Sequence, residues 1–206
     1  MKSLRKMTLA VVATGALMTP VGVTVATAAP AAAGCVTPAG DPCPTPAQLE
    51  AAARQKVIDR AAKWMNGYKG GVVPYSMSRW IKSGTIYSSY QSGSWRTDCS
   101  GYASMALQIP SSYGGPNTEA LATTTYTTKL SGISQLRKGD LIIDPRTSDG
   151  DFRHVVIFQK WKDASNKSLG YWAYEQRGTY GTTHRVLKYG IGADHYDLYS
   201  PKKLNY

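Results

Sequence analysis

Residues that bind metal ions are scarce in this chain of 206 residues, which holds three cysteines, three histidines and 13 acidic side chains. The sequence contains neither a His-Glu-x-x-His pattern nor a Cys-x-x-Cys pair, two spacings that are typical of zinc sites. Asp144, Asp149 and Asp151 lack the spacing of a calcium-binding loop. We therefore expect a protein that works without a metal ion or another cofactor.

Long apolar runs are absent after the N-terminal region, so no later stretch is expected to span a bilayer. The N-terminus combines a basic head, MKSLRK, with a mostly apolar stretch that ends in small residues. This order is typical of a secretory signal peptide, and residues 26–28 and 31–33 both match its A-x-A cleavage pattern. A retained membrane helix is the alternative, but Pro20 and two glycines interrupt the apolar run. We expect residues 1–28 to be a signal peptide, and the mature protein to be secreted without a stable membrane anchor.

Acidic side chains are outnumbered by 24 lysines and arginines, which gives the chain a net charge of +11. Loss of the signal peptide would remove Lys2, Arg5 and Lys6 and leave a charge of +8. A basic surface attracts anions, and for a secreted chain we expect anionic wall polymers or acidic peptides as partners. No nucleic-acid-binding motif accompanies the charge, so we expect no nucleic-acid partner. A basic surface without an anionic partner is the alternative.

The three cysteines divide into a close pair and a single one. Cys35 and Cys43 lie in an Ala-, Pro- and Gly-rich stretch, residues 29–44, which is typical of a linker. In an oxidising compartment the two can form a disulfide. A lipid anchor on Cys35 is the alternative, although Ala32 stands where such sites usually have a larger aliphatic residue. Cys99 is left as the odd thiol.

The remaining residues, 45–206, suit a single domain with a sizeable core. A capping box that begins at Thr45 and Pro46 predicts a helix, which apolar residues at helical spacing continue up to Gly67. Residues 71–98 are rich in Gly, Ser and Tyr and predict a long irregular segment. Such a segment in a compact domain is often functional.

The last third of the chain changes from helical to strand-like spacing. Short runs rich in β-branched and aromatic residues are separated by Gly, Asp, Asn and Pro. They are residues 140–144, 154–161, 171–176, 184–189 and 196–200. Helices followed by strands predict an α+β domain, in which N-terminal helices pack on an antiparallel sheet of about five strands.

Cys99 lies in RTDCSGYASMAL, where the Gly- and Ser-rich segment gives way to a short apolar helix that is expected to end before Pro110. The partial positive charge at a helix N-terminus stabilises a thiolate, and a backbone N–H at such a turn can bind an oxyanion. Cys99 is therefore a candidate nucleophile. The alternative is a small buried hydrophobic residue, a common role for cysteine.

A cysteine nucleophile needs a base, and His154 is the best placed of the three histidines because it opens the most apolar strand, HVVIF. The next strand, YWAYEQ, holds Glu175 and Gln176, either of which could accept the other ring N–H of the imidazole. Neighbouring residues of a strand point to opposite faces, so only one of the two can do so. The sequence alone leaves both open.

Taken together, RTDCSGYASMAL, LRKGDLIID and HVVIF, followed by a polar residue on the next strand, resemble the NlpC-type family of bacterial cell-wall cysteine peptidases. The segment GVVPYSMSRW is similar to the family's Tyr-containing segment before the nucleophile. The resemblance covers roughly residues 47–200 and implies a papain-like α+β core. It implies Cys99 as the nucleophile, His154 as the base and Glu175 as the residue that orients the base, where family members usually carry His, Asn or Gln.

The same resemblance implies three side chains on the substrate side of the cleft: Tyr75, Asp98 and Ser100. Asp98 would there pair with an amine of the substrate. The chain departs from the family pattern in PYSMSRW, where relatives tend to have Trp-Gly-Gly, so the choice of substrate is left open. Three arginines could also meet substrate carboxylates, with plain solvation as the alternative: Arg79, Arg96 and Arg153.

These observations favour a secreted, monomeric cysteine endopeptidase or amidase, associated with the cell wall, that cleaves amide bonds of peptidoglycan stem peptides through an acyl-enzyme. The same Cys–His chemistry fits an acyltransferase that passes the acyl group to an amine. A third alternative is a wall-binding protein in which the catalytic residues are vestigial.

Overall fold

The computed structural model describes residues 35–82, 94–110, 114–146 and 153–204. The predicted signal peptide and the first part of the predicted linker lie outside these ranges. The chain divides into two compact units, Met1–Cys43 and Pro44–Tyr206. The division falls beside the predicted end of the linker.

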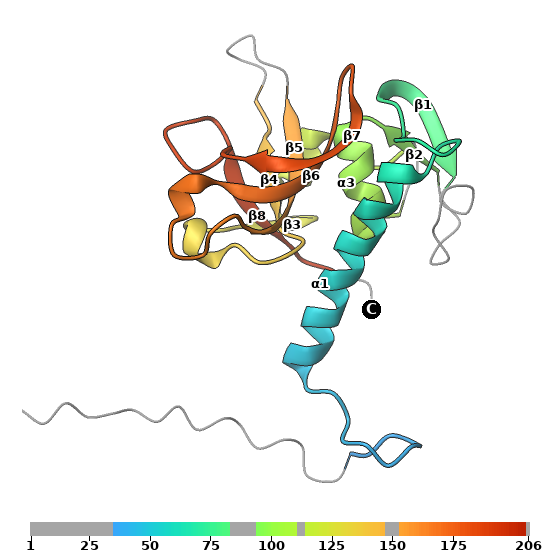
Figure 1. Ribbon diagram of the computed structural model, residues 1–206, viewed down its shortest axis with the longest axis vertical. Helices are drawn as coiled ribbons and strands as arrows, with labels where there is room; N and C mark the ends of the chain where they lie inside the picture. The colour runs from blue at the N-terminus through green and yellow to red at the C-terminus, as the bar shows by residue number, and fades with distance from the viewer. Residues whose placement is uncertain (1–34, 83–93, 111–113, 147–152, 205–206) are drawn as a thin grey trace, which may run out of the picture. The chain divides into compact units, whose positions relative to one another are not determined.

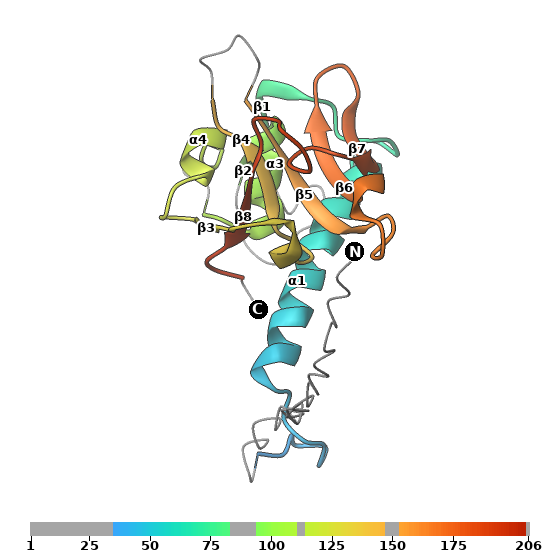
Figure 2. The same ribbon diagram turned by 90° about the vertical axis from the view of Figure 1, so that its left-hand side faces the viewer.

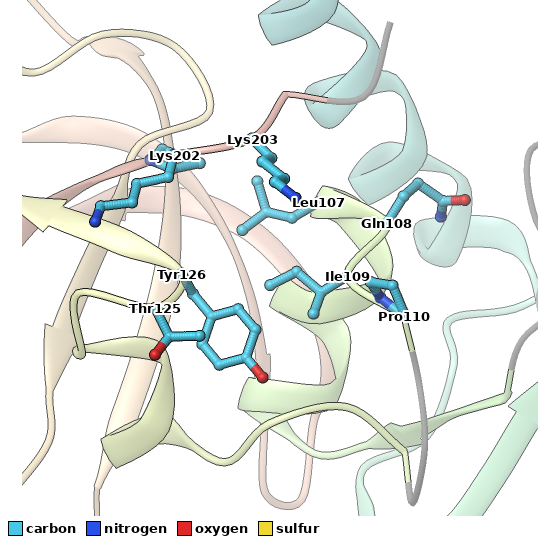
Figure 3. Close-up of a pocket in the computed structure, with 9 residues that line it drawn as sticks. Leu107, Gln108, Ile109, Pro110, Thr125, Tyr126, Lys202 and Lys203 are labelled. Carbon is cyan, nitrogen blue, oxygen red and sulfur yellow. The ribbon is translucent and has the colours of Figure 1, made fainter.

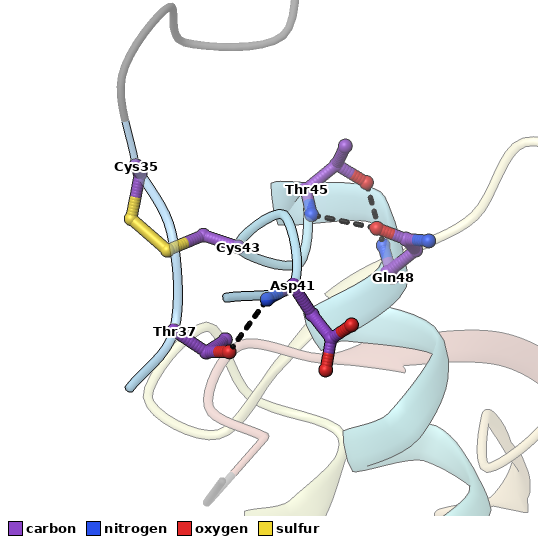
Figure 4. Close-up of a disulfide and its surroundings, with 6 residues drawn as sticks. All are labelled: Cys35, Thr37, Asp41, Cys43, Thr45 and Gln48. Carbon is purple, nitrogen blue, oxygen red and sulfur yellow. Dashed lines mark hydrogen bonds between the residues drawn. A yellow bond between two sulfur atoms is a disulfide. The ribbon is translucent and has the colours of Figure 1, made fainter. Parts of the chain in front are cut away.

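In the first unit, the described residues form a small loop closed by a disulfide between Cys35 and Cys43 (Figure 4). The backbone N–H of Cys43 donates to the carbonyl oxygen of Cys35 at 3.2 Å. Inside the loop, the hydroxyl of Thr37 accepts a hydrogen bond from the N–H of Asp41 at 3.2 Å. The disulfide predicted from the sequence is thus confirmed.

The second unit begins with the long helix α1 (Pro46–Lys63), which a 3-10 turn, η1 (Trp64–Asn66), extends. The capping box is present: the hydroxyl of Thr45 accepts from the N–H of Gln48, and the Gln48 side chain accepts from the N–H of Thr45 at 2.7 Å (Figure 4). Of the helices in the described part of the chain, none is long and apolar enough to cross a membrane.

Six strands form one antiparallel sheet in the order β3-β8-β4-β5-β6-β7 (Figure 1). Their bounds are β3 (Thr127–Lys129), β4 (Leu141–Asp144), β5 (His154–Trp161), β6 (Tyr171–Arg177), β7 (Gly181–Leu187) and β8 (Asp197–Pro201). Two 3-10 turns, η2 (Ile133–Gln135) and η3 (Lys167–Leu169), lie between them. The α+β class is confirmed, and the sheet has six strands rather than about five because the short edge strand β3 was not expected.

The two faces of this sheet carry different cores. Helix α3 (Cys99–Leu107) packs with α1 on one face, and all nine of its residues are buried (Figure 1, Figure 2). Because neighbouring residues of a strand alternate, Val155 and Ile157 of β5 enter this helix-covered core, while Val156 and Phe158 enter a second apolar cluster on the other face. The helix-covered core places α3 directly against β5 and β6.

The segment 71–98, which was expected to be irregular, contains an antiparallel strand pair, β1 (Ser76–Lys82) and β2 (Ser94–Thr97). The expectation was wrong for these two strands because it rested on local Gly and Ser content. Trp95 is fully buried, and its indole N–H donates to the carbonyl oxygen of Ile109 at 3.1 Å. Such long-range burial outweighs a weak local strand preference.

A buried ion pair ties α1 to the start of β4. Nη1 of Arg54 donates to Oδ1 of Asp140 at 2.7 Å, and the hydroxyl of Ser200 donates to the same oxygen at 2.9 Å. The backbone N–H of Arg137 donates to the second oxygen at 2.7 Å. Asp140 is fully buried. The acidic residue of the KGDL motif therefore holds the fold together.

Candidate active site

Cys99 is the first residue of α3, and the local sequence explains why the helix begins there. Asp98 is the N-cap, with extended backbone angles and a side chain that accepts a hydrogen bond from the N–H of Gly101 at 2.7 Å. Any Cβ at position 101 would overlap the carbonyl group of Arg96, so the close approach of β2 to α3 requires glycine. The D-C-S-G block thus turns the chain from β2 into α3 with the sulfur at the helix N-terminus.

The side chain of Arg96 stabilises this turn through hydrogen bonds. Its Nε donates to Asp98 at 2.7 Å, its Nη2 donates to the hydroxyl of Ser100 at 3.1 Å, and its Nη1 donates to the carbonyl oxygen of Gly115 at 2.8 Å. The Ser100 hydroxyl donates to Asp98 at 3.0 Å. Asp98 and Ser100 are both buried. A substrate amine at Asp98 would have to compete with these bonds, and the substrate-binding role of both residues stays a prediction.

The sulfur of Cys99 lies where three elements meet. Its Sγ is 3.8 Å from the hydroxyl of Thr118, the first residue of α4 (Thr118–Leu121), and 3.9 Å from the carbonyl oxygen of Arg153. Arg153 immediately precedes His154, the first residue of β5. The side chain of Cys99 is buried apart from a small exposed fraction of 6%. The sulfur therefore sits at the start of α3, α4 and β5 together.

His154 is hydrogen-bonded to a carboxylate and immediately follows Arg153, whose carbonyl oxygen lies 3.9 Å from the sulfur of Cys99. Its Nε2 lies 2.9 Å from Oε2 of Glu175, which leaves Nδ1 for the thiol. Burial acts to lower the pKa of His154, but hydrogen bonds to Cys99 and Glu175 and the negative charges of both outweigh it and raise the pKa to about 9. The imidazole is then positively charged at neutral pH. Such a cation stabilises a neighbouring thiolate.

Glu175 is almost fully buried, with 1% of its side chain exposed. It lies opposite Val156 in the register of β5 and β6, so it shares a face of the sheet with His154, two residues before Val156. One oxygen serves His154, while the other accepts from Nε of Arg185 at 2.5 Å and from the hydroxyl of Thr183 at 3.1 Å. The carboxylate is thus divided between the imidazole and two fixed donors on β7.

The ionisation of Glu175 follows from the same contacts. Burial acts to raise the pKa of Glu175, but hydrogen bonds from His154 and Arg185 and their positive charges outweigh burial and lower it to about 2. The group is therefore a carboxylate throughout the range in which the imidazole is charged. An ionised acceptor on Nε2 fixes the orientation of the ring, which is what a positioning residue for a catalytic base must do.

Gln176, the alternative that the sequence left open, points elsewhere. Its side-chain amide donates to the carbonyl oxygens of Val73 at 3.0 Å and Thr97 at 3.1 Å, and its oxygen accepts from the hydroxyl of Thr182 at 2.6 Å. It is fully buried. Gln176 therefore fixes β6 to the chain just before Cys99, and the contact with His154 belongs to Glu175.

The remaining predicted residues are placed as follows. Tyr75 is half-buried just before β1; burial, together with the negative charges of Cys99 and Asp98, raises its pKa to about 12. The phenol therefore lies within electrostatic range of the sulfur. The guanidinium of Arg153 donates to Glu119 at 3.2 Å. The side chain of Arg79 lies outside the described residues.

Four partners of the site were not predicted from the sequence: Thr118, Thr183, Arg185 and Tyr189. Tyr189 meets the His154 ring edge-on at a centroid distance of 6.2 Å, and its hydroxyl accepts from Arg185 at 3.4 Å. HRVLKY was expected to be a strand, so alternation could have placed Arg185 and Leu187 on one face. To know that this face is the one that carries Glu175, the register between β7 and β6 would also have been needed.

Neither protein-family models, curated proteins nor solved structures gave a match to this chain. Among the described residues, no group of three or more His, Cys, Asp and Glu side chains is arranged to hold a metal ion. A cavity of about 300 Å³ lies at the opposite end of α3 from Cys99, lined by Leu107, Ile109 and Tyr126 with Lys202 and Lys203 at its edge (Figure 3). None of the predicted site residues lines it.

Proposed function

We propose that this protein is a secreted cysteine hydrolase with a papain-like core that cleaves amide bonds in peptidoglycan stem peptides. The observation that carries the proposal is the hydrogen bond between His154 and the carboxylate of Glu175, beside the sulfur of Cys99 at the start of a buried helix; that sulfur lies 3.9 Å from the carbonyl oxygen of the residue before His154. A thiol, an imidazole and an orienting acceptor in this order are the parts of a thiol acyl-transfer site. The choice of substrate rests on the family resemblance of the sequence.

The proposed reaction begins with the thiolate of Cys99 and the imidazolium of His154. The sulfur attacks the amide carbon, and the carbonyl oxygen becomes an oxyanion beside the N-terminus of α3. His154 gives its Nδ1 proton to the amide nitrogen, the C–N bond breaks, and the amine leaves. A water molecule then gives a proton to His154 and attacks the acyl carbon, which releases a carboxylic acid and restores the thiolate of Cys99 beside the imidazolium. Glu175 holds the ring through Nε2 in both steps.

The proposed location is outside the cell, at the wall. The signal-like N-terminus and the basic charge support it, and the disulfide between Cys35 and Cys43 is consistent with an oxidising compartment. A monomer acting on wall peptides or anionic wall polymers is the corresponding proposal for its partners.

Purified muropeptides test the proposal directly. Wild-type protein should release the expected fragments, and Cys99→Ala should release none while keeping the same circular dichroism and melting temperature. Mass spectrometry of the products, with and without an added amine, separates hydrolysis from acyl transfer, because transfer adds the mass of the amine. Equal cleavage by Cys99→Ala would remove the catalytic role of the thiol.

A further inference from the structure

The hairpin that joins β6 to β7 carries a cation on an exposed aromatic ring. The guanidinium carbon of Arg177 lies 3.9 Å from the centre of the Tyr180 ring, and 61% of Tyr180 is exposed. About a third of the Arg177 side chain is exposed, 30%. Stacking on a ring fixes the guanidinium plane without occupying its terminal N–H groups. The hairpin therefore presents a preoriented cation to solvent.

This hairpin is anchored beside the nucleophile. Gln176, next to Arg177, donates to the carbonyl oxygen of Thr97, two residues before Cys99. On the other strand, the N–H of Thr182 donates to the carbonyl oxygen of Val73 at 3.1 Å. In both ribbon views the tip of the hairpin lies beside the segment that leads into β1 (Figure 1, Figure 2). The stacked Arg177 is thus held at the edge of the site.

Positively charged side chains outnumber carboxylates around Glu175. Its single carboxylate faces His154, Arg185 and Arg177, whose Nε lies 3.8 Å from Oε1. That Nε is buried, and no hydrogen-bond partner is found for it among the described residues. Neighbouring acids are engaged elsewhere: Glu119 with Arg153 and Asp144 with Arg146. Even with the imidazole facing the sulfur of Cys99, two guanidinium groups, those of Arg185 and Arg177, share the one carboxylate of Glu175.

We propose that Arg177, stacked on Tyr180, binds a carboxylate of the substrate close to the scissile amide and makes the site selective for acidic peptides. The proposal rests on the proposed function for the reaction itself. An arginine fork suits a carboxylate in a bidentate geometry, and a carboxamide of the same shape offers no charge. Arg177 would thus decide which peptides are cleaved, while Cys99 and His154 carry out the reaction.

The test compares one stem peptide with its carboxylates free and the same peptide with them amidated. Wild type should prefer the free acid in kcat/KM by about tenfold, the range of one charge-assisted hydrogen bond. Arg177→Gln should reduce this preference to less than about twofold, and Arg177→Lys should give an intermediate value. Lys160→Gln removes the same charge at the far end of β5 and should leave the preference unchanged. A normal rate of Cys99 alkylation by iodoacetamide would show that each variant keeps an intact site.

Binding of the two peptides to Cys99→Ala, measured by calorimetry, separates this proposal from the proposed function. If wild type cleaves both peptides equally, or if Arg177→Gln keeps the tenfold preference, the role of Arg177 is wrong and hydrolysis stands. If wild type cleaves neither peptide, an acid preference in binding that disappears in the Cys99→Ala, Arg177→Gln double variant still supports the subsite. Equal binding of both peptides, or binding of neither, overturns it.

Discussion

Asp140 and Glu175 are two buried carboxylates that have similar hydrogen-bond partners but lie in different surroundings. Asp140 and Glu175 each accept from an arginine and a hydroxyl, and both are almost fully buried. The remaining partner differs: the second oxygen of Asp140 accepts from a backbone N–H, whereas that of Glu175 meets the imidazole of His154. Only the second arrangement contains an imidazole, whose pKa the surrounding groups raise to about 9.

The comparison shows which feature turns a structural ion pair into a possible reaction site. Burial and an arginine keep both carboxylates in place. The imidazole is different because 17% of it remains exposed and because its second nitrogen is left for a thiol. The same kind of buried carboxylate therefore stabilises the fold at Asp140 and holds an imidazole in place at Glu175.

The largest effect should come from removing the acceptor of the imidazole. Glu175→Ala is expected to lower kcat/KM by about a thousandfold, since His154 loses the contact that fixes its ring and its charge. Kinetics on a defined stem peptide measure this loss. Gln176→Ala is the matched control, because it removes a neighbouring buried side chain of β6 that does not contact His154. A greater loss in Gln176→Ala would reassign the positioning role.

Asp140→Ala should lower the stability of the protein and leave its kcat almost unchanged. Removing one partner leaves Arg54 buried without its carboxylate, which costs about 3–5 kcal/mol of unfolding free energy. Urea denaturation measures this cost. Below the melting temperature, kcat of the folded variant should stay within about threefold of wild type, because no partner of Asp140 belongs to the site. A large loss of kcat with unchanged stability would contradict the structural assignment.

The smallest of the three effects is the pH dependence of stability, which should differ between the contacts of Glu175 with His154 and the contacts of Asp140 with Arg54. The pKa of His154 is raised from 6.5 to about 9. The contribution of His154 to the free energy of unfolding is therefore complete below pH 6.5 and disappears as the pH rises through 9. The stability difference between wild type and His154→Gln should therefore fall by roughly 3 kcal/mol from pH 6 to pH 10. The difference between wild type and Asp140→Asn should stay flat, because no imidazole contacts Asp140. Parallel curves for the two variants would show that the imidazole is not charged in the folded protein.

Local patterns accounted for the parts of the fold that depend on neighbours in the sequence. The start of α1 followed from the Thr45 capping box, and five strands followed from alternation and turn residues. Burial of Trp95 across the chain produced β2 within a segment whose composition predicted no strand. Because side chains alternate between the two faces of a strand, the sequence also showed that only one of Glu175 and Gln176 could face His154.

Long-range register limited the prediction of the candidate site. Glu175 and Gln176 differ in their partners because β6 pairs with β5 at Val156, and the sequence of β6 alone contains no sign of that pairing. The partner of Asp140 is Arg54, 86 residues earlier in the chain. Thr183 and Arg185 reach Glu175 only through the pairing of β6 with β7. Such contacts require the three-dimensional arrangement of the strands.

All nine residues of α3 are buried, and this has a consequence for how the protein could change during evolution or engineering. The sulfur is carried by a helix that has little freedom to shift, because any displacement of the helix would disturb the core around it. Under the proposed function, new preferences for peptides should therefore arise by altering the β6–β7 hairpin and the chain before β1, while the helix that bears the thiol stays as it is. Those two segments are where a randomised library would be best placed.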